Sequence, residues 1–178
     1  TGQEPCSLAM MLKEMGREVE DWRIDILATD LSAAVLEKAR QGIYSQFEAQ
    51  RGLPIQLLIK YFTQVGDRWQ ISPKIRGMVQ YREFNLLNDP KPLGRFDVVF
   101  CRNVLIYFDQ PTKAKILNNV AGLMPEDGYL FLGGAETVLG ITDRFQLLAG
   151  QRGVYGLAAA GAKAPAAGAL RSPQPAPC

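Results

Sequence analysis

The pattern of apolar and polar positions predicts helices that alternate with buried strands. Apolar residues at helical spacing predict helices over residues 5–14, 32–40, 54–62 and 111–124. Continuous apolar runs predict strands over residues 24–28, 96–101 and 129–134. This alternation favours an α/β fold built on a doubly wound, mainly parallel sheet. Two short segments, FQLL and GVYGL, follow in the sequence and predict an antiparallel hairpin at one edge of that sheet.

The pattern changes between the first and second of these strands. WQIS (69–72) and MVQYREF (78–84) alternate like short strands, with turn residues between them. We therefore predict that these two segments pair with each other as a small antiparallel insertion.

Local signals predict where two of the helices begin and end. Thr1 and Glu4 have the spacing of a capping box at the start of the first helix. Ser32 is a candidate N-cap for the next helix, and Gly42 is a candidate stop.

The last part of the chain has a different composition. From Ala158 onward the sequence consists mostly of Ala, Pro and Gly and contains no aromatic residue. Such composition is typical of a disordered tail or linker, and both a linker to a further domain and a plain terminus stay open. We expect residues 1–157 to form one domain and residues 158–178 to lie outside it. Because the chain begins with Thr1, we expect it to start inside a longer protein.

Composition narrows the classes of function. Lys and Arg number 20 against 18 Asp and Glu, so we expect neither a nucleic-acid partner nor direct insertion in a membrane. The chain has no histidine and three widely spaced cysteines, which argues against a histidine triad, a disulfide framework and a metal site. A cytoplasmic location fits the cysteines best, and a monomeric state is favoured because the sequence leaves no extended apolar stripe uncommitted.

Polar residues at strand ends are the candidate site residues, since open α/β sheets bind ligands there. Asp30 ends the first predicted strand, and its carboxylate matches the spacing of a ribose diol. It fits NAD and S-adenosylmethionine equally, and capping of the next helix is an equal alternative. Asn85 and Leu86 follow another strand and can flank an adenine; a role of Asn85 in ending the strand is an equal alternative.

Two further segments carry candidate residues. Arg102, Asn103 and Tyr107 follow the apolar strand that ends at Cys101, and a polar cluster there suits a ligand site. A surface salt bridge for Arg102 and a core ring for Tyr107 are the alternatives. Near the start, the glycine of TGQEP permits close approach of a ligand, and Glu4 contacts a cofactor or only serves the cap.

Taken together, six segments resemble the CheR family of chemotaxis receptor glutamate methyltransferases. The resemblance spans Thr1 to about Leu157 and is carried by TGQEP, LATDLS, EKARQGIY, FNLL, FDVVFCRNVLIYF and DGYLFLGGAET. It implies a Rossmann-like class I methyltransferase domain with a seven-stranded-type sheet and an inserted β-subdomain at about residues 43–78. It also implies a strand and an N-terminal helical domain before Thr1.

The resemblance implies an activity and assigns roles to residues. Family members transfer a methyl group from S-adenosylmethionine to glutamate side chains on the cytoplasmic helices of chemoreceptors, which leaves S-adenosylhomocysteine. Cofactor-binding positions carried over by motif are Glu4, Asp30, Asn85, Leu86, Arg102 and Asn103. Arg102 and Tyr107 are the positions that border methyl transfer, and no metal is implied.

Some features of the sequence differ from the family pattern. Cys6 stands where an aromatic residue is common, and GGAE (133–136) stands where many members have Gly-His-Ser-Glu. The loop TQVGDRWQIS is short, so we do not expect a tethering peptide to bind there. The rival interpretations are a methyltransferase of the same fold with another substrate and a binding module without catalysis. An NAD dehydrogenase is less favoured because no complete GxGxxG is present.

Overall fold

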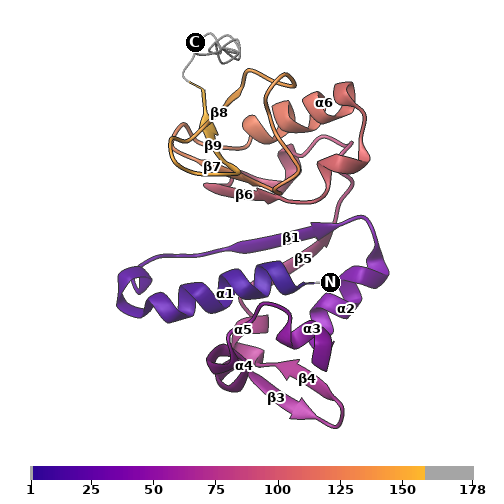
Figure 1. The fold of residues 1–178 in the computed structure, drawn as a ribbon, viewed down its shortest axis with the longest axis vertical. Coiled ribbons are helices and arrows are strands. Elements are labelled where there is room, and N and C mark those ends of the chain that lie inside the picture. Colours follow the sequence, from indigo (N-terminus) through magenta and orange to yellow (C-terminus); the bar gives the residue numbers. More distant parts are fainter. Residues whose placement is uncertain (1, 159–178) are drawn as a thin grey trace, which may run out of the picture. The chain divides into compact units, whose positions relative to one another are not determined.

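The computed structural model describes residues 2–158, and the chain divides into two compact units (Figure 1). The first unit is Thr1–Asn85 and the second is Leu86–Cys178. Each unit is built from its own strands and helices and has its own hydrophobic core. The tail predicted for residues 158–178 lies, apart from Ala158, outside the described residues.

A pair of parallel strands forms the part of the first unit that matters for the site. β1 (Ile26–Asp30) pairs with β5 (Val79–Glu83), with Asp30 opposite Glu83. The helices that accompany this pair are α1 (Gln3–Met15) and α2 (Ala33–Gln41). A 3-10 turn, η1 (Gly16–Val19), follows α1. Because the two strands are parallel, their carboxyl ends lie at one edge.

The rest of the first unit contains a three-stranded antiparallel sheet with the order β2-β4-β3. The elements of this region are β2 (Ile43–Ser45), α3 (Gln46–Gln50), α4 (Ile55–Tyr61), β3 (Phe62–Val65), β4 (Arg68–Ile71) and α5 (Pro73–Arg76). They fall within the range of about 43–78 expected for a β-subdomain.

The predicted pairing of residues 69–72 with residues 78–84 is wrong. β4 pairs with β2 and β3, while β5 pairs in parallel with β1. The reason lies in the connection: Ser72 caps α5, and Pro73 occupies its first turn. A helical turn here directs the chain away from the antiparallel sheet instead of folding it back as a hairpin.

The second unit is built on a mixed four-stranded sheet with the order β6-β7-β9-β8. β6 (Val98–Cys101) and β7 (Tyr129–Leu132) are parallel, and α6 (Gln110–Ala121) connects them. β8 (Phe145–Leu147) and β9 (Val154–Leu157) form the predicted antiparallel hairpin, which continues the sheet from β7. Two 3-10 turns complete the unit, η2 (Lys91–Leu93) and η3 (Leu105–Tyr107).

Burial explains why α6 and the sheet hold together. Ile116 and Leu117 on α6 and Leu130 on β7 are at most 1% exposed and belong to one cluster. Cys101, at the end of β6, is buried in the same cluster. The predicted helix and the two predicted strands therefore form this core, which supports the turn that follows β6.

The sequence predicted helix ends with mixed success. Ser32 accepts a hydrogen bond from the Val35 amide, and Gly42 ends α2 in the left-handed conformation, both as predicted. The capping box of Thr1 with Glu4 is wrong, because α1 has Gly2 as its N-cap and lacks a side-chain cap. Gly2 has a φ of 87°, which glycine adopts without the steric penalty of a Cβ.

The fold class is α/β, but the expected single sheet of seven-stranded type is not what the described residues form. Their strands make three sheets of two, three and four strands. Apolar runs indicate which segments are buried strands, but they do not specify the hydrogen-bonding partners of each strand. The number of strands in one sheet therefore could not be predicted from this pattern. Within residues 2–158 no helix is long and apolar enough to cross a membrane.

Candidate functional site

The first part of the candidate site lies where β1 and β5 end. Asp30 is the last residue of β1, and its carbonyl accepts a hydrogen bond from the Phe84 amide at 3.0 Å. Asn85 is the next residue after Phe84 and is partly buried. The structure thus brings Asp30 and Asn85 to the same edge of the parallel pair, as predicted from their places after two strands.

The side chain of Asp30 also shapes the turn into α2. Its Oδ1 accepts a hydrogen bond from the Ser32 amide at 2.8 Å, and the Ser32 hydroxyl in turn accepts one from Val35 at 3.3 Å. The N-cap is therefore Ser32, and Asp30 orders the residues before it. This contact fixes the direction in which the carboxylate leaves the strand.

Glu4 lies in the first turn of α1, and the glycine before this helix has a packing role. A Cβ on Gly2 would lie 2.9 Å from Cβ of Ala39 and 3.1 Å from the Tyr81 hydroxyl. The start of α1 therefore sits directly against α2 and β5. The glycine of TGQEP thus permits close packing of α1 against other parts of the protein. From the sequence, we had expected this glycine to permit the close approach of a ligand.

The Cys6 side chain belongs to the same packing. Its sulfur lies 3.6 Å from the Tyr81 hydroxyl and 3.9 Å from the Tyr44 hydroxyl. Burial raises the pKa of the Cys6 thiol, and its hydrogen bonds with Tyr81 and Tyr44 oppose that rise. The thiol is therefore neutral at pH 7 and fills the core below α1 as a small apolar group.

The second part of the candidate site follows β6. Arg102 and Asn103 come directly after Cys101 and are exposed. Tyr107 ends η3 and is 80% exposed, so it is not a core ring. Leu86, the first residue of the second unit, packs against that unit's core cluster.

Asn103 has an unusual backbone conformation. Its φ is 58°, and among the described residues it is the one non-glycine residue with a positive φ. Asparagine tolerates this region better than most residues, but the conformation still has to be held by surrounding contacts. The chain therefore turns sharply at the point where two predicted cofactor residues stand.

The contacts that hold this turn come from Glu136, which sequence reasoning did not select. Oε2 of Glu136 accepts hydrogen bonds from the amides of Asn103 and Gly133, both at 2.7 Å. Oε1 accepts from the amides of Val104 at 2.9 Å and Leu105 at 2.7 Å. We call this arrangement the Glu136 clamp: one carboxylate joins the turn after β6 to the turn after β7.

Glu136 is charged in this setting although it is buried. It is 9% exposed. Burial alone would raise the pKa of its carboxyl, but the four backbone amides outweigh burial and hold the pKa below its ordinary value. A carboxylate that accepts several backbone amides is stabilised in its ionised form. The Glu136 carboxylate is therefore a buried anion, and the four hydrogen bonds that it accepts come from main-chain amides.

Gly133 lets the carboxylate approach the turn. A Cβ at this position would lie 2.7 Å from Oε2 of Glu136 and 3.1 Å from the amide nitrogen of Asn103. In the sequence the only sign of the clamp was GGAE directly after a buried strand. Glu136 and Asn103 are 33 residues apart, and no local spacing rule connects them.

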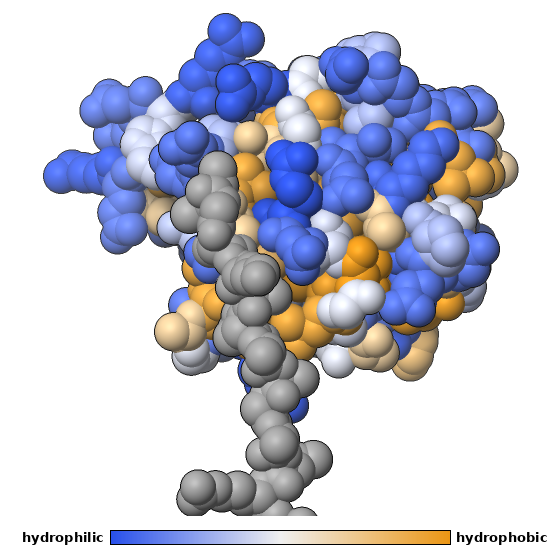
Figure 2. Space-filling view, turned by 90° about the horizontal axis from the view of Figure 1, so that it is seen from above, coloured by the Kyte–Doolittle hydropathy of each residue, from blue (hydrophilic) through white to orange (hydrophobic). Residues whose placement is uncertain are grey.

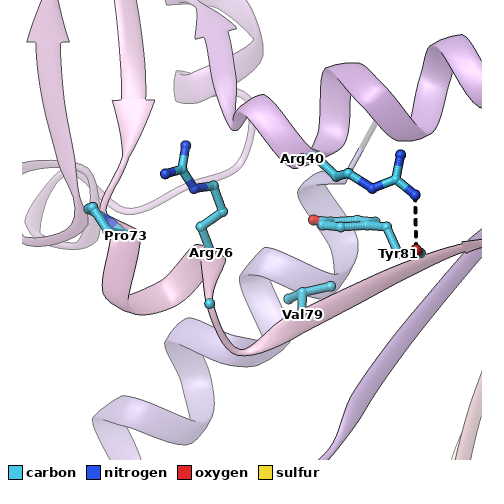
Figure 3. A pocket seen from close by; sticks show the side chains of 6 residues that line it. Arg40, Pro73, Arg76, Val79 and Tyr81 are labelled. Carbon is cyan, nitrogen blue, oxygen red and sulfur yellow. Dashed lines mark hydrogen bonds between the residues drawn. The ribbon is translucent and has the colours of Figure 1, made fainter.

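A pocket lies elsewhere in the first unit. It has a volume of about 290 Å³ and is lined by Arg40, Pro73, Arg76, Gly77, Val79 and Tyr81 (Figure 3). Arg40 donates a hydrogen bond to the Tyr81 carbonyl, and Arg76 donates one to the Gln41 carbonyl, each at 3.0 Å. Val79 begins β5, so this hollow does not lie at the strand ends that carry Asp30 and Asn85.

The surface is mixed in character. Figure 2 shows one face on which hydrophilic residues predominate and apolar patches show between them. Ile106, which lies in η3 within the second part of the candidate site, is one of the exposed apolar residues. Single exposed apolar residues are ordinary on protein surfaces, and they give no separate indication of function.

Comparison with known proteins identifies the family of the chain that carries these strand-end residues. The model of the CheR methyltransferase SAM-binding domain matches residues 1–154. The chain belongs to the CheR methyltransferase family. S-adenosylmethionine is accordingly the cofactor of this CheR domain, and the resemblance noted from six sequence segments is confirmed.

Curated relatives agree with this assignment. Chemotaxis protein methyltransferase Cher2 of Pseudomonas putida is 41% identical over 152 residues, which are 83% of this chain and 55% of that protein. Chemotaxis protein methyltransferase 1 of Vibrio cholerae is 38% identical over 151 residues, with coverage of 83% and 55%. The CheR domain described here thus spans about half the length of these relatives.

A more distant relative and a solved structure complete the comparison. The probable biofilm formation methyltransferase WspC of Pseudomonas aeruginosa is 36% identical over 141 residues, which cover 78% of this chain and 33% of that protein. A solved structure described as a pericyclic reaction enzyme gives a TM-score of 0.43 at 17% identity and covers 79% of this chain and 27% of its own. That structural likeness is too low to inform the fold.

The predicted site residues of this CheR domain form two sets. Glu4, Asp30 and Asn85 belong to the first unit, and the other four belong to the second. Within the sets, the structure brings Asp30 beside Asn85, and it places Arg102 and Asn103 on the clamped turn. Their union in one cofactor pocket is part of the proposal that follows.

Proposed function

We propose that the protein transfers the methyl group of S-adenosylmethionine to glutamate side chains on the cytoplasmic helices of chemoreceptors. The observation that carries this proposal is the match of the CheR family model to residues 1–154. The names of the relatives, which are chemotaxis protein methyltransferases, support the same substrate class.

The residues at the strand ends fit the cofactor. An acid and an amide stand together at the carboxyl edge of β1 and β5, which is where open α/β sheets bind nucleosides. In the proposed pocket the Asp30 carboxylate accepts hydrogen bonds from the two ribose hydroxyls. Asn85 and Leu86 flank the adenine with one polar and one apolar side chain. Glu4 lies toward the sugar or the amino-acid end of the cofactor.

The turn after β6 provides the groups for the reacting end. The planar guanidinium of Arg102 suits a two-pronged contact with a carboxylate, either that of the cofactor or that of the incoming glutamate. Asn103 assists in binding the cofactor. Tyr107 is exposed on η3, and its hydroxyl orients the substrate carboxylate or the methyl group.

The reaction needs orientation more than acid–base catalysis. Bound S-adenosylmethionine supplies an electrophilic methyl group on a sulfonium. The accepting glutamate is already ionised at neutral pH, with a reference pKa of about 4.3, so no base has to remove a proton. A chain without histidine therefore loses nothing, and positioning of the two reactants can contribute about 7–11 kcal/mol.

We propose the following organisation for the protein as a whole. Residues 1–157 form a Rossmann-like class I methyltransferase domain, supported by the parallel pairs β1–β5 and β6–β7. The antiparallel sheet within about residues 43–78 is the inserted β-subdomain that contacts the receptor, without a tethering peptide. We expect a cytoplasmic, monomeric protein, and residues 158–178 as a tail or linker.

Calorimetric titration with S-adenosylhomocysteine tests the cofactor site. We expect binding by the protein and a loss of at least about tenfold in Asp30→Ala, which corresponds to about 1.4 kcal/mol. Ser32→Ala is the matched control, because it removes the cap of the same turn without removing the carboxylate. Equal affinity in Asp30→Ala and the wild type would contradict the assignment of Asp30.

Methyl transfer by the full-length protein tests the substrate. Receptor cytoplasmic fragments should become methylated at glutamate residues, and small-molecule acceptors should not. Arg102→Ala should lose turnover while remaining folded. Full activity of Arg102→Ala would contradict its role, and methylation of small acceptors alone would favour a methyltransferase with another substrate.

A further inference from the structure

We propose that Glu136 is a positioning residue for methyl transfer: its carboxylate sets the backbone turn from which Arg102 and Asn103 reach the cofactor. This inference rests on the proposed function, since it assumes that these two residues serve the site. It goes beyond that function by assigning a role to a residue that the proposed pocket does not include.

The clamp connects two turns that belong to neighbouring parallel strands. Cys101, the last residue of β6, is in register with Leu132, the last residue of β7. The segments that follow, 102–105 and 133–136, leave the sheet at the same edge. Glu136 stands in the second segment and accepts hydrogen bonds from three successive amides of the first.

The geometry of the turn depends on this carboxylate. With Asn103 at a φ of 58°, the amides of residues 103–105 point toward one spot, as in other anion-binding main-chain turns. A non-glycine residue in this conformation persists only where its surroundings impose it. Without an acceptor at that spot, three amide donors would lose their hydrogen-bond partner. The contacts that hold the turn in this conformation would then be absent.

A role in stability alone is the competing explanation. A buried carboxylate with four backbone donors stabilises the fold whether or not a ligand binds. The two explanations differ in one measurable respect. If Glu136 positions the site, its removal changes the affinity for the cofactor in molecules that are still folded; if it only stabilises, the folded molecules bind as before.

The substitution Glu136→Gln isolates the clamp because it preserves side-chain shape. A glutamine has one carbonyl oxygen and one NH2 group, whereas each carboxylate oxygen of Glu136 now serves two amides. In either orientation two amide donors therefore face another donor. Glu126→Gln is the matched control, since Glu126 is exposed in the same unit and its replacement removes the same charge.

The experiment titrates S-adenosylhomocysteine into the full-length wild type, E136Q and E126Q, well below the Tm of each. We expect the dissociation constant of E136Q to rise at least about tenfold, while that of E126Q stays within about twofold of the wild type. In methylation assays, the KM for S-adenosylmethionine should rise in E136Q. Should E136Q fail to fold, E136D replaces it, because aspartate keeps the charge but is too short to reach all four amides.

The outcomes separate this inference from the proposed function. Wild-type protein that does not bind S-adenosylhomocysteine would refute the proposed function and this inference with it. Wild-type binding together with an unchanged dissociation constant in E136Q, or in E136D if E136Q does not fold, would overturn the positioning role alone. A fall in Tm without a change in affinity would leave Glu136 as a residue of stability only.

Discussion

Substitution of Gly133 by alanine should destabilise the second unit by crowding the Glu136 clamp. The new Cβ would lie 2.7 Å from Oε2 of Glu136, about 0.7 Å short of the 3.4 Å at which ordinary contact begins. The same Cβ would lie 3.1 Å from the amide nitrogen of Asn103. The backbone of Gly133 is not in the left-handed region, so the expected effect is steric and does not arise from backbone strain.

The magnitude follows from what has to move. Overpacking in a tight site costs about 1–3 kcal/mol. A shift of Oε2 by about 0.7 Å would lengthen its two bonds, now 2.7 Å, beyond the ordinary range of about 2.7–3.2 Å. Hydrogen bonds to charged groups contribute about 1.5–3 kcal/mol each, and only part of that is lost on lengthening. We therefore expect a decrease of at least about 2 kcal/mol in the free energy of unfolding.

Gly134→Ala is the matched control. A Cβ on Gly134 would meet no atom within 4 Å, and this glycine is also outside the left-handed region. A substitution of glycine by alanine at a compatible site stabilises by about 0.4–1 kcal/mol. The same glycine-to-alanine substitution at Gly134 should therefore raise the free energy of unfolding, whereas at Gly133 it should lower it.

The assay has to report on the second unit. Both tryptophans, Trp22 and Trp69, lie in the first unit, so tryptophan fluorescence would not detect local unfolding around Gly133. Urea denaturation followed by far-UV circular dichroism, with hydrogen exchange of the amides of residues 103–105, reports on the correct region. If Gly133→Ala and Gly134→Ala had the same urea midpoint and exchange rates, the clamp would tolerate a methyl group and the reasoning would be refuted.

Further predictions concern the cap, the core and the charge of the clamp. Ser32→Ala removes the N-cap of α2 and should lower the free energy of unfolding by about 1 kcal/mol, measured by urea denaturation with Ser32→Asp as a variant that retains a cap. Leu130→Ala, at a position that is 0% exposed, should cost about 2–5 kcal/mol; a loss under about 1 kcal/mol would contradict the packing of β7 against α6. The pKa of Glu136 is held below its reference of 4.5, so its stabilisation should be complete above that pH and decline as pH falls through the lower pKa of the folded state. The difference in urea midpoint between the wild type and E136Q should therefore shrink in acid, and a difference that grows in acid would reverse the assigned sign.

Local signals in the sequence predicted the elements that begin and end at characteristic residues. Ser32 and Gly42 defined α2, and the apolar runs identified β1, β6 and β7 to within a few residues. The candidate residues Asp30 and Asn85 lie at one edge because parallel strands place their carboxyl ends together. Periodicity and capping are local properties, and these features depend on them.

Strand pairing and the clamp depend on contacts that local signals do not encode. WQIS was identified as a strand but given the wrong partner, because a short helix at Pro73 redirects the chain before β5. Glu136 remained undetected because its partners lie up to 33 residues away in the sequence. A lone acid after a glycine pair has no periodic signature, and its importance becomes visible only when the amides that converge on it are located.

The Glu136 clamp also limits how the turn after β6 can recognise an anion. Three consecutive amides in a sharp turn are a common means of binding phosphate or carboxylate groups through the main chain. Here those amides are already occupied by a carboxylate from the protein itself. A negatively charged group that approaches this turn must therefore be recognised by side chains, and side-chain recognition can be altered by single substitutions in a way that main-chain recognition cannot. In the proposed site, the selectivity of this turn for an anionic ligand would therefore depend on side chains such as that of Arg102.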